Sequence, residues 1–203
     1  MIGIADYKMG NLASLLNSLK KIGKEAKIVR EPDELSACDR AILPGVGAFG
    51  DAADHLKESA MDEAIKTFVA KGKPLLGVCL GLQLLFESSE ESPKAIGLGL
   101  LKGTVKRFDP TKAAHAIKIP HMGWNKLNIA RSSPLFEGVS DGDRLYFVHS
   151  YHAVCDESIA IGRAFYGYEF VCAVQSANIY AIQPHPEKSS DVGLRILKNF
   201  AEL

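Results

Sequence analysis

The first half of the chain alternates short apolar runs with segments whose apolar residues recur at helical spacing. Runs of this length are typical of buried strands. Strands are predicted at IGIA (2–5), AKIVR (26–30), RAILPG (40–45) and PLLGVC (74–79). Helices are predicted over residues 12–22, 49–71 and 80–90, and a glycine follows each of the first two. Strands that alternate with helices indicate a parallel sheet covered on both faces.

The second half changes character, because its apolar runs are strand-like and are separated by turns. These runs are LLKGTVKRF (100–108), KLNIA (126–130), RLYFVHSYHAV (144–154), AIGRAFYG (160–167), FVCAVQS (170–176) and NIYAIQP (178–184). A helix is predicted over residues 192–203. We therefore predict one α/β domain over residues 1–203, with a central, mostly parallel sheet flanked by helices and additional antiparallel strands in the second half.

Composition narrows the class of protein. Lys plus Arg and Asp plus Glu both number 24 in 203 residues, so the formal net charge is zero and no basic excess indicates nucleic-acid binding. Asp6 interrupts any apolar leader, and no run is long enough to span a membrane. Four cysteines in 203 residues are too sparse for a disulfide framework, and none forms a CxxC pair, which argues against a structural zinc site. We expect a cytoplasmic protein without a metal, a membrane anchor or a nucleic-acid partner.

Cys79 stands between two glycines where a predicted strand turns into a predicted helix. The pattern Gly77-x-Cys79-x-Gly81 has the form of a nucleophile elbow with sulfur in place of oxygen. We expect a side chain at either glycine to collide with neighbouring backbone. The start of a helix favours a thiolate, and the N–H of Leu80 is placed to bind an oxyanion. The alternative interpretation is a buried core cysteine beside helix-packing glycines.

A thiolate nucleophile needs a base and a group that orients the base. His185 stands just beyond a predicted strand with a proline on each side, and Glu187 follows two positions later. In an extended segment both side chains lie on one side, so the carboxylate can hold the imidazole tautomer. The alternative is a rigid surface loop. His149 and His152 are predicted to face opposite sides of one strand, because they are three positions apart.

The segment PGVGAFG (44–50) satisfies the dinucleotide fingerprint G-x-G-x-x-G and precedes a predicted helix. Pro44 disturbs the strand-to-turn geometry, however, and no acidic residue ends the next strand about 20 residues further on. The preferred interpretation is a loop at the same sheet edge as Cys79, whose backbone N–H groups supply a second oxyanion donor. Nucleotide binding stays as an alternative.

Taken together, PGVGAFG, GVCLGLQLLF and HPEKS resemble, in this order and over nearly the whole chain, the class I glutamine amidotransferases. The resemblance implies a flavodoxin-like fold and a glutaminase without a cofactor. It also implies a triad of Cys79, His185 and Glu187. The implied oxyanion hole is formed by the backbone of Leu80 and of Gly47, next to Val46. The implied glutamine pocket consists of Gln83, Glu91, His149, Ser150 and Tyr151.

The string IPHMGWN (119–125), with DYKMGN (6–11) and YFVHSY (146–151), is similar to the glutaminase subunits of imidazole glycerol phosphate synthases. Such subunits form a heterodimer with a (β/α)8 barrel cyclase subunit and pass ammonia to it in histidine biosynthesis. The resemblance places Asn11, Trp124, Tyr146 and Lys188 at the partner interface. The structural alternative for the string is a turn with a buried tryptophan.

Other functions stay open. A paralogous amidotransferase subunit would supply ammonia to another acceptor, such as a sugar nucleotide. A pyridoxal phosphate synthase glutaminase is disfavoured because its Gly-Gly-Glu-Ser motif is absent. From another class, an elbow-cysteine peptidase or chaperone would lack the IPHMGWN string.

Two positions depart from the family pattern. Pro184 replaces the usual Phe before His185, which removes a backbone N–H and an aromatic wall. Lys8 replaces a usual Gly, and it is strained there if the backbone requires a positive φ.

Overall fold

Five parallel strands form the centre of the computed structural model, which describes residues 1–113 and 115–203. Their order across the sheet is β2-β1-β3-β4-β13, and each neighbouring pair is parallel. This is the strand order of flavodoxin-like proteins, so the predicted α/β fold is confirmed. The bounds are Ile2–Ala5 (β1), Ala26–Val29 (β2), Arg40–Gly45 (β3), Leu75–Cys79 (β4) and Ile179–Ile182 (β13).

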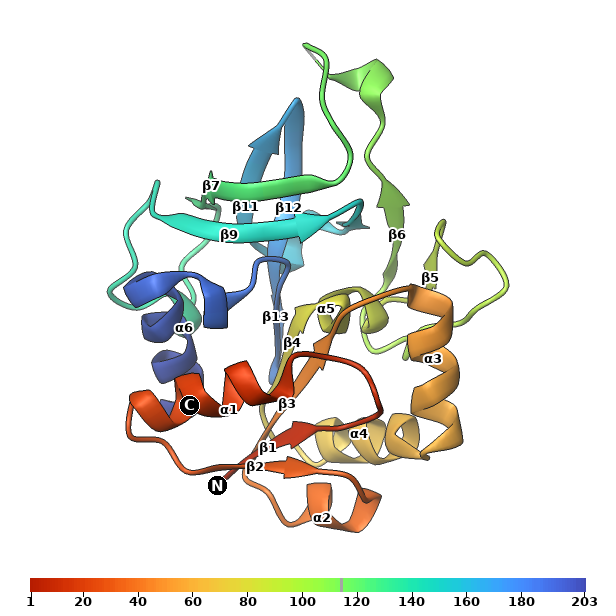
Figure 1. The fold of residues 1–203 in the computed structure, drawn as a ribbon, viewed down its shortest axis with the longest axis vertical. Coiled ribbons are helices and arrows are strands. Elements are labelled where there is room, and N and C mark those ends of the chain that lie inside the picture. Colours follow the sequence, from red (N-terminus) through yellow and green to blue (C-terminus); the bar gives the residue numbers. More distant parts are fainter. Residues whose placement is uncertain (114) are drawn as a thin grey trace.

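Antiparallel strands extend the sheet beyond β13, as the second half of the sequence predicts (Figure 1). The path continues antiparallel through β12, β10 and β6 and ends at β5, which is parallel to β6, while β11 pairs with β12 and β8 pairs with β11. A separate two-stranded ribbon pairs β7 with β9. The bounds are Ser88–Ser89 (β5), Gly103–Arg107 (β6), His121–Lys126 (β7), Asn128–Ile129 (β8), Arg144–His149 (β9), Tyr151–Cys155 (β10), Ala160–Tyr166 (β11) and Tyr168–Ser176 (β12).

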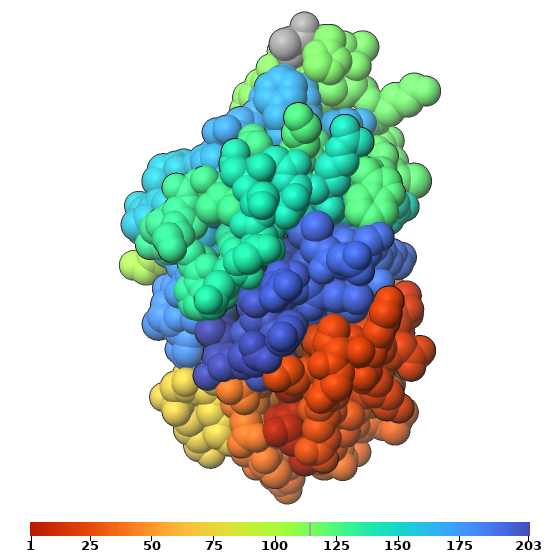
Figure 2. All heavy atoms as spheres, turned by 90° about the vertical axis from the view of Figure 1, so that its left-hand side faces the viewer, coloured from red at the N-terminus to blue at the C-terminus, as the bar shows by residue number. Residues whose placement is uncertain are grey.

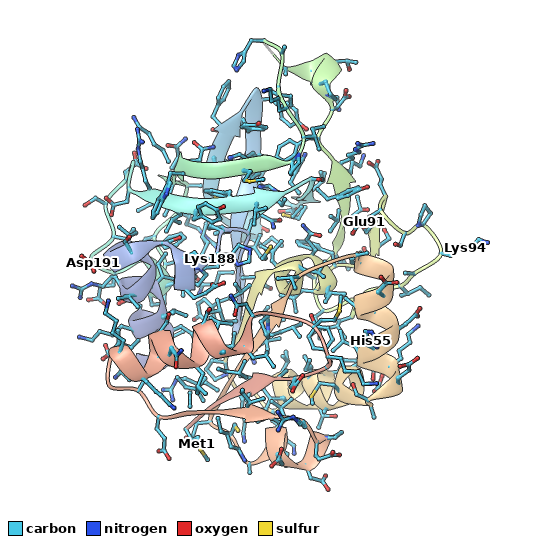
Figure 3. All side chains as sticks on the ribbon, viewed as in Figure 1. Met1, His55, Glu91, Lys94, Lys188 and Asp191 are labelled. Atoms are coloured by element: carbon cyan, nitrogen blue, oxygen red, sulfur yellow. The ribbon has the colours of Figure 1, made fainter. Side chains whose placement is uncertain are left out.

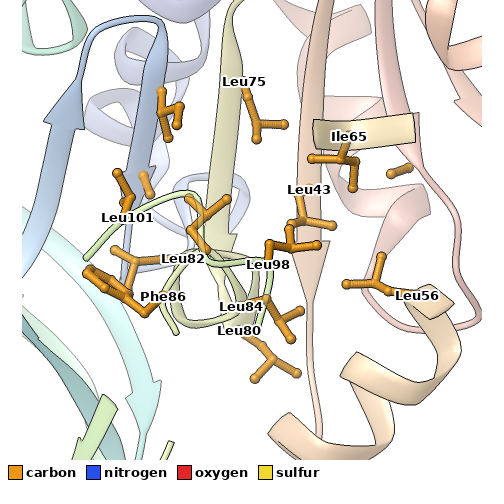
Figure 4. Packing of buried hydrophobic residues seen from close by; sticks show 14 of the residues in the cluster. Leu43, Leu56, Ile65, Leu75, Leu80, Leu82, Leu84, Phe86, Leu98 and Leu101 are labelled. Carbon is orange, nitrogen blue, oxygen red and sulfur yellow. The ribbon is translucent and has the colours of Figure 1, made fainter. Parts of the chain in front are cut away.

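Helices cover both faces of the parallel half (Figure 1). Side chains along a strand point alternately to the two faces, so Leu43 packs in one core and Ile42 in the other. The core of Leu43 is closed by α3, α4 and α5, and Figure 4 shows its leucines packed around β4. The core of Ile42 is closed by α1 and α6, which lie side by side in Figure 2. The helix bounds are Leu12–Lys21 (α1), Pro32–Ser36 (α2), Phe49–Glu58 (α3), Met61–Ala70 (α4), Leu80–Leu84 (α5) and Ser190–Glu202 (α6).

The single helix predicted over residues 49–71 is wrong, because the segment forms two helices, α3 and α4. The break falls at Ala60, which has a left-handed φ of 55° and is exposed. The Ser59 hydroxyl donates to the carbonyls of His55 and Leu56 at 2.7 and 3.2 Å and so satisfies the end of α3. The helix predicted over 80–90 is likewise shorter, because α5 ends at Leu84.

The strand predicted over residues 144–154 is also wrong, because the chain divides at Ser150 into β9 and β10, which belong to different sheets. His149 and His152 therefore do not face opposite sides. Both rings pack against Phe108, with centroid distances of 5.1 and 4.9 Å. A period-two pattern cannot detect this division, because the apolar alternation runs on through both strands.

The string IPHMGWN contains a strand rather than a turn with a buried tryptophan. In β7 the odd positions His121 and Asn125 point inward, whereas Met122 and Trp124 are 61% and 49% exposed. The alternative interpretation of a buried tryptophan is therefore wrong. Among the residues that the structure describes, no helix has both the length and the hydrophobicity needed to cross a bilayer.

Lys8 has a left-handed backbone with φ of +70°. Lysine at this position, where the family usually has glycine, is therefore strained, as the sequence predicts for a positive φ. A residue with a Cβ is disfavoured in this region by about 1 kcal/mol. We expect Lys8→Gly to raise the free energy of unfolding by about 0.5–1 kcal/mol, measured by urea denaturation. As a matched control, Lys66→Gly in the middle of α4 should lower it by about 1 kcal/mol. A destabilised Lys8→Gly variant would contradict the argument.

Candidate functional site

Cys79 ends β4 and begins the turn into α5, with φ 56° and ψ −112°. This strained backbone fits the elbow predicted from the glycine pattern. A Cβ at Gly77 would lie 2.9 Å from the carbonyl oxygen of Gly81, and one at Gly81 would overlap the carbonyl oxygen of Leu43. The expected collisions at both glycines are confirmed. The turn therefore brings the start of α5 directly against β3.

A cavity of about 320 Å³ opens beside the sulfur of Cys79, within the size range of small-molecule sites. The structure brings most of the sequence-predicted site residues together around it. The predicted residues that line it are Val46, Gly47, Cys79, Leu80, Gln83, Glu91, His149, Ser150, Tyr151 and His185. Pro120 and Val148 line it as well and were not predicted. Glu187 does not line it, because it lies behind the ring of His185.

His185 and Glu187 form a buried pair. The Nδ1 atom of His185 lies 2.8 Å from Glu187 Oε1, and the two side chains are 3% and 2% exposed. Burial lowers the pKa of His185, but the sulfur of Cys79 and the carboxylate of Glu187 raise it further, to about 10. The proton therefore rests on the imidazole at neutral pH. Among the described residues, Nε2 of His185 has no hydrogen-bond partner and is available for a reacting group.

Pro184 is buried and does not disturb the backbone on either side of it. The Gln183 N–H donates to the Cys172 carbonyl at 2.7 Å, and the His185 N–H donates to the Tyr146 carbonyl at 2.9 Å. The backbone N–H groups of Gln183 and His185, on either side of Pro184, both have hydrogen-bond partners. The segment that carries His185 is therefore held without the N–H that proline lacks.

The glycine loop after β3 is held from two sides. The Phe49 N–H donates to Glu91 at 2.8 Å, and the Gly50 N–H donates to the Ser92 hydroxyl at 3.2 Å. Figure 3 shows Glu91 beside the start of α3. A carboxylate already occupies this helix start, where a dinucleotide phosphate would bind, which disfavours the nucleotide alternative. Gly47 lies at the cavity with φ of +92°, a conformation that favours glycine.

Tyr7 supports the strand that leads into this loop. Its hydroxyl donates to the Pro44 carbonyl at 2.6 Å, and a Cβ at Gly45 would lie 2.7 Å from that hydroxyl oxygen. Burial, with a smaller contribution from the charge of Cys79, raises the pKa of Tyr7, so the phenol stays protonated. Tyr7 therefore fixes the end of β3, at Pro44 and Gly45, from which the glycine loop starts.

A neutral histidine, His149, lines the other wall, and a second one, His121, lies behind it. Burial lowers the pKa of His149 to about 3 and that of His121 to about 4. The carbonyl of Tyr151 can only accept, so the His149 Nδ1–H donates to it at 2.7 Å. His149 Nε2 then accepts from His121 Nδ1 at 3.0 Å, and His121 Nε2 accepts from the Asn125 amide at 3.2 Å. The tautomers of both rings are thus determined.

Residue-by-residue reasoning on the sequence missed two residues of the site, His121 and Gln183. Gln183 is fully buried, and its Nε2 donates to the sulfur of Cys79 at 3.7 Å. An amide residue 104 positions from the nucleophile has no local signal that would single it out. Its only signal is its place at the end of a strand, one residue before the PHPE segment.

Three of the four predicted interface residues, Trp124, Tyr146 and Lys188, lie next to one another. Trp124 packs edge-on against Tyr146 with ring centroids 6.1 Å apart, and Lys188 Nζ lies 6.0 Å from the centroid of the Tyr146 ring. Asn11 precedes α1, and its side chain makes no capping bond. Within residues 1–113 and 115–203, no recorded hydrogen bond or ring contact joins Asn11 to the other three. The same residues contain no cluster of three His, Cys, Asp or Glu side chains suited to hold a metal.

Comparison with known proteins places this site in context. Residues 4–203 match the family model of glutamine amidotransferase class-I. The "Imidazole glycerol phosphate synthase subunit HisH" of Sulfurimonas denitrificans is 58% identical and covers 100% of this chain and 98% of its own. The protein of the same name from Wolinella succinogenes is 54% identical, with 100% of both chains covered. A crystal structure of a glutamine amidotransferase, 22% identical, covers 100% of this chain and 99% of its own with a TM-score of 0.76, which supports the fold.

The raised pKa of His185 predicts a pH dependence of stability. Because the folded pKa, about 10, exceeds the ordinary value of 6.5, the charged ring stabilises the fold fully below pH 6.5. This contribution is lost as the pH rises through 10. Glu187→Gln removes one cause of the raised pKa, so we expect His185 to titrate at lower pH by NMR and its stabilisation to be lost earlier. The exposed Glu63→Gln should leave the titration unchanged. Identical titrations in the Glu187 variant and the parent protein would contradict the pairing.

Proposed function

The chain belongs to the class I glutamine amidotransferase family, and we propose that it is the glutaminase subunit of an imidazole glycerol phosphate synthase. The observation that carries this proposal is the meeting of Cys79 and His185 at one cavity, with Glu187 bonded to the far side of the His185 ring and Cys79 on an elbow whose glycines have no room for a side chain. The proposed subunit identity is supported by relatives that match the full length of the chain and are all named imidazole glycerol phosphate synthase subunit HisH. The proposed activity is the hydrolysis of glutamine to glutamate and ammonia.

The proposed chemistry is acyl transfer through a thioester. His185 holds the proton of Cys79, and the thiolate attacks the side-chain carboxamide of glutamine. The backbone N–H groups of Leu80 and Gly47 stabilise the tetrahedral oxyanion. The C–N bond then breaks, and His185 gives its proton to the departing ammonia. Water attacks the γ-glutamyl thioester with His185 as base, which releases glutamate and restores the thiol.

Glu187 and the cavity walls have supporting roles in this proposal. Glu187 stabilises the imidazolium and sets the ring orientation, since it bonds Nδ1 and leaves Nε2 for the reacting atoms. Gln83, Glu91 and the His149–Tyr151 segment bind glutamine in the cavity. Val46 carries the peptide that ends in the Gly47 N–H, and it is 42% exposed. No step requires a cofactor.

Ammonia made at this site needs an acceptor on another polypeptide. By the family relationship the partner is the (β/α)8 barrel cyclase subunit, which combines ammonia with the ribulosyl aminoimidazole carboxamide nucleotide to give imidazole glycerol phosphate and AICAR. The proposed docking surface is the outer face of β7 and β9, with Trp124, Tyr146 and Lys188, together with Asn11. All four cysteines are free, which fits the reducing cytoplasm that the sequence predicts.

Replacement of the nucleophile tests the reaction. We expect Cys79→Ala to lower the rate of glutamate release from glutamine by about 10⁴-fold or more, because loss of a triad nucleophile has effects of this size. The matched control is Cys155→Ala, a thiol outside the cavity, which should retain the parental rate. The assay measures glutamate with the cyclase subunit and its nucleotide present. Unchanged activity in Cys79→Ala would rule out the thioester.

Replacement of the exposed aromatic tests the partner. We expect Trp124→Ala to weaken binding to the cyclase subunit about 30-fold in calorimetry, because buried aromatic anchors dominate interfaces. Ile96→Ala, which removes an apolar side chain that is 65% exposed on the loop after β5, should bind like the parent protein. If the parent chain neither binds the cyclase subunit nor gains activity from it, the acceptor is a different one, such as a sugar nucleotide synthase.

A further inference from the structure

A continuous chain of buried hydrogen bonds ends on the sulfur of Cys79. We propose that Gln183 is a further catalytic residue, whose amide N–H stabilises the Cys79 thiolate before attack and again after the thioester is hydrolysed. The inference deepens the proposed function, on which it rests, and it concerns a residue that the Cys–His–Glu triad does not include.

The orientation of the Gln183 amide follows from its neighbours rather than from an arbitrary assignment of oxygen and nitrogen. The Tyr151 carbonyl can only accept, so the end of Gln83 that lies 3.1 Å from it must be the NH₂ group. That same Nε2 lies 3.1 Å from one end of Gln183, which must therefore be the oxygen. The other end of Gln183 is then the NH₂ group, and it is the end that faces sulfur.

The Tyr151 carbonyl is itself held from a second side. It accepts the His149 Nδ1–H at 2.7 Å, and His149 is backed by His121 and Asn125 of β7. Both rings are neutral, so each has one donor and one acceptor nitrogen and the direction of the chain cannot reverse. The Asn125 amide also donates to the Phe165 carbonyl at 2.8 Å, which anchors the outer end.

The environment of the sulfur distinguishes thiol from thiolate. The Gln183 Nε2 lies 3.7 Å from Sγ, and the Val148 carbonyl oxygen lies 4.0 Å from it. A thiol can donate toward that carbonyl, whereas a thiolate is repelled by it and attracted by the amide N–H. Gln183 is fully buried, and a donor to a charged acceptor acts strongly where water is excluded. The amide therefore favours the charged nucleophile together with protonated His185.

The buried position also permits a clean test. If Gln183 becomes Met, Gln83 Nε2 keeps its bond to the Tyr151 carbonyl, so this buried donor retains a partner. Met has nearly the length of Gln and no N–H. Gln183→Leu removes the same donor with a different shape. Ile182→Val, at the adjacent fully buried position of β13, alters packing without touching a hydrogen bond and serves as the matched control.

The experiment measures the rate of Cys79 alkylation by iodoacetamide against pH on the isolated chain, without glutamine or a partner. We expect the midpoint of the profile to move up by about one pH unit in Gln183→Met and Gln183→Leu, with alkylation at neutral pH about 10-fold slower. Ile182→Val should keep the parental midpoint, and circular dichroism and thermal unfolding establish that each variant is folded.

Two outcomes would overturn the inference: parental midpoints in both folded Gln183 variants, or an equal shift in Ile182→Val. The result is separable from the proposed function. Alkylation reports the state of the sulfur whether or not the chain hydrolyses glutamine, and the Cys79→Ala assay tests hydrolysis whether or not Gln183 contributes.

Discussion

The close approach of α5 to β3 is the constraint on which the site depends. Gly81 lies so near the carbonyl of Leu43 that no Cβ fits between them, and Gly77 lies almost as near to Gly81. This packing forces the chain to turn sharply at Cys79 and to adopt a positive φ there. The sulfur consequently stands at the carboxyl edge of the parallel strands, where open α/β sheets form their sites. The leucines around it are buried in the core, and Cys79, although buried as well, also lines the cavity.

The two halves of the sheet form different walls of the cavity. The parallel half positions the proposed nucleophile Cys79, the glycine loop after β3 and, through β13 beside β4, the proposed base His185 at the same edge. The antiparallel half and the β7–β9 ribbon supply the opposite wall, because the chain crosses from β9 to β10 at Ser150. One ribbon therefore has an outer face with Trp124 and Tyr146 and an inner face with His121 and His149.

Burial acts on the histidines of the site in opposite directions according to their partners. His185 faces the carboxylate of Glu187 and the sulfur of Cys79, so its pKa rises to about 10 although burial opposes this. His149 and His121 face only neutral groups, so burial prevails and their pKa values fall to about 3 and 4. The same kind of ring is thus charged in one wall, and in the other it is neutral, with one nitrogen that donates and one that accepts a hydrogen bond. A second carboxylate, Glu91, is engaged with the start of α3 and leaves the base to Glu187.

Local sequence patterns were sufficient for the strands of the parallel half, the elbow at Cys79 and the pairing of His185 with Glu187. Each of these depends on residues within a few positions of one another, where spacing and backbone restrictions act directly. The divisions at Ala60 and Ser150 were missed, because apolar periodicity continues through both. The contact between Gln183 and Cys79, and the chain from Asn125 through His121 to Tyr151, join segments that only sheet pairing brings together. Hydrogen-bond partners at such separations leave no period in the sequence, so the tertiary structure alone decided which buried amides and imidazoles surround the thiol.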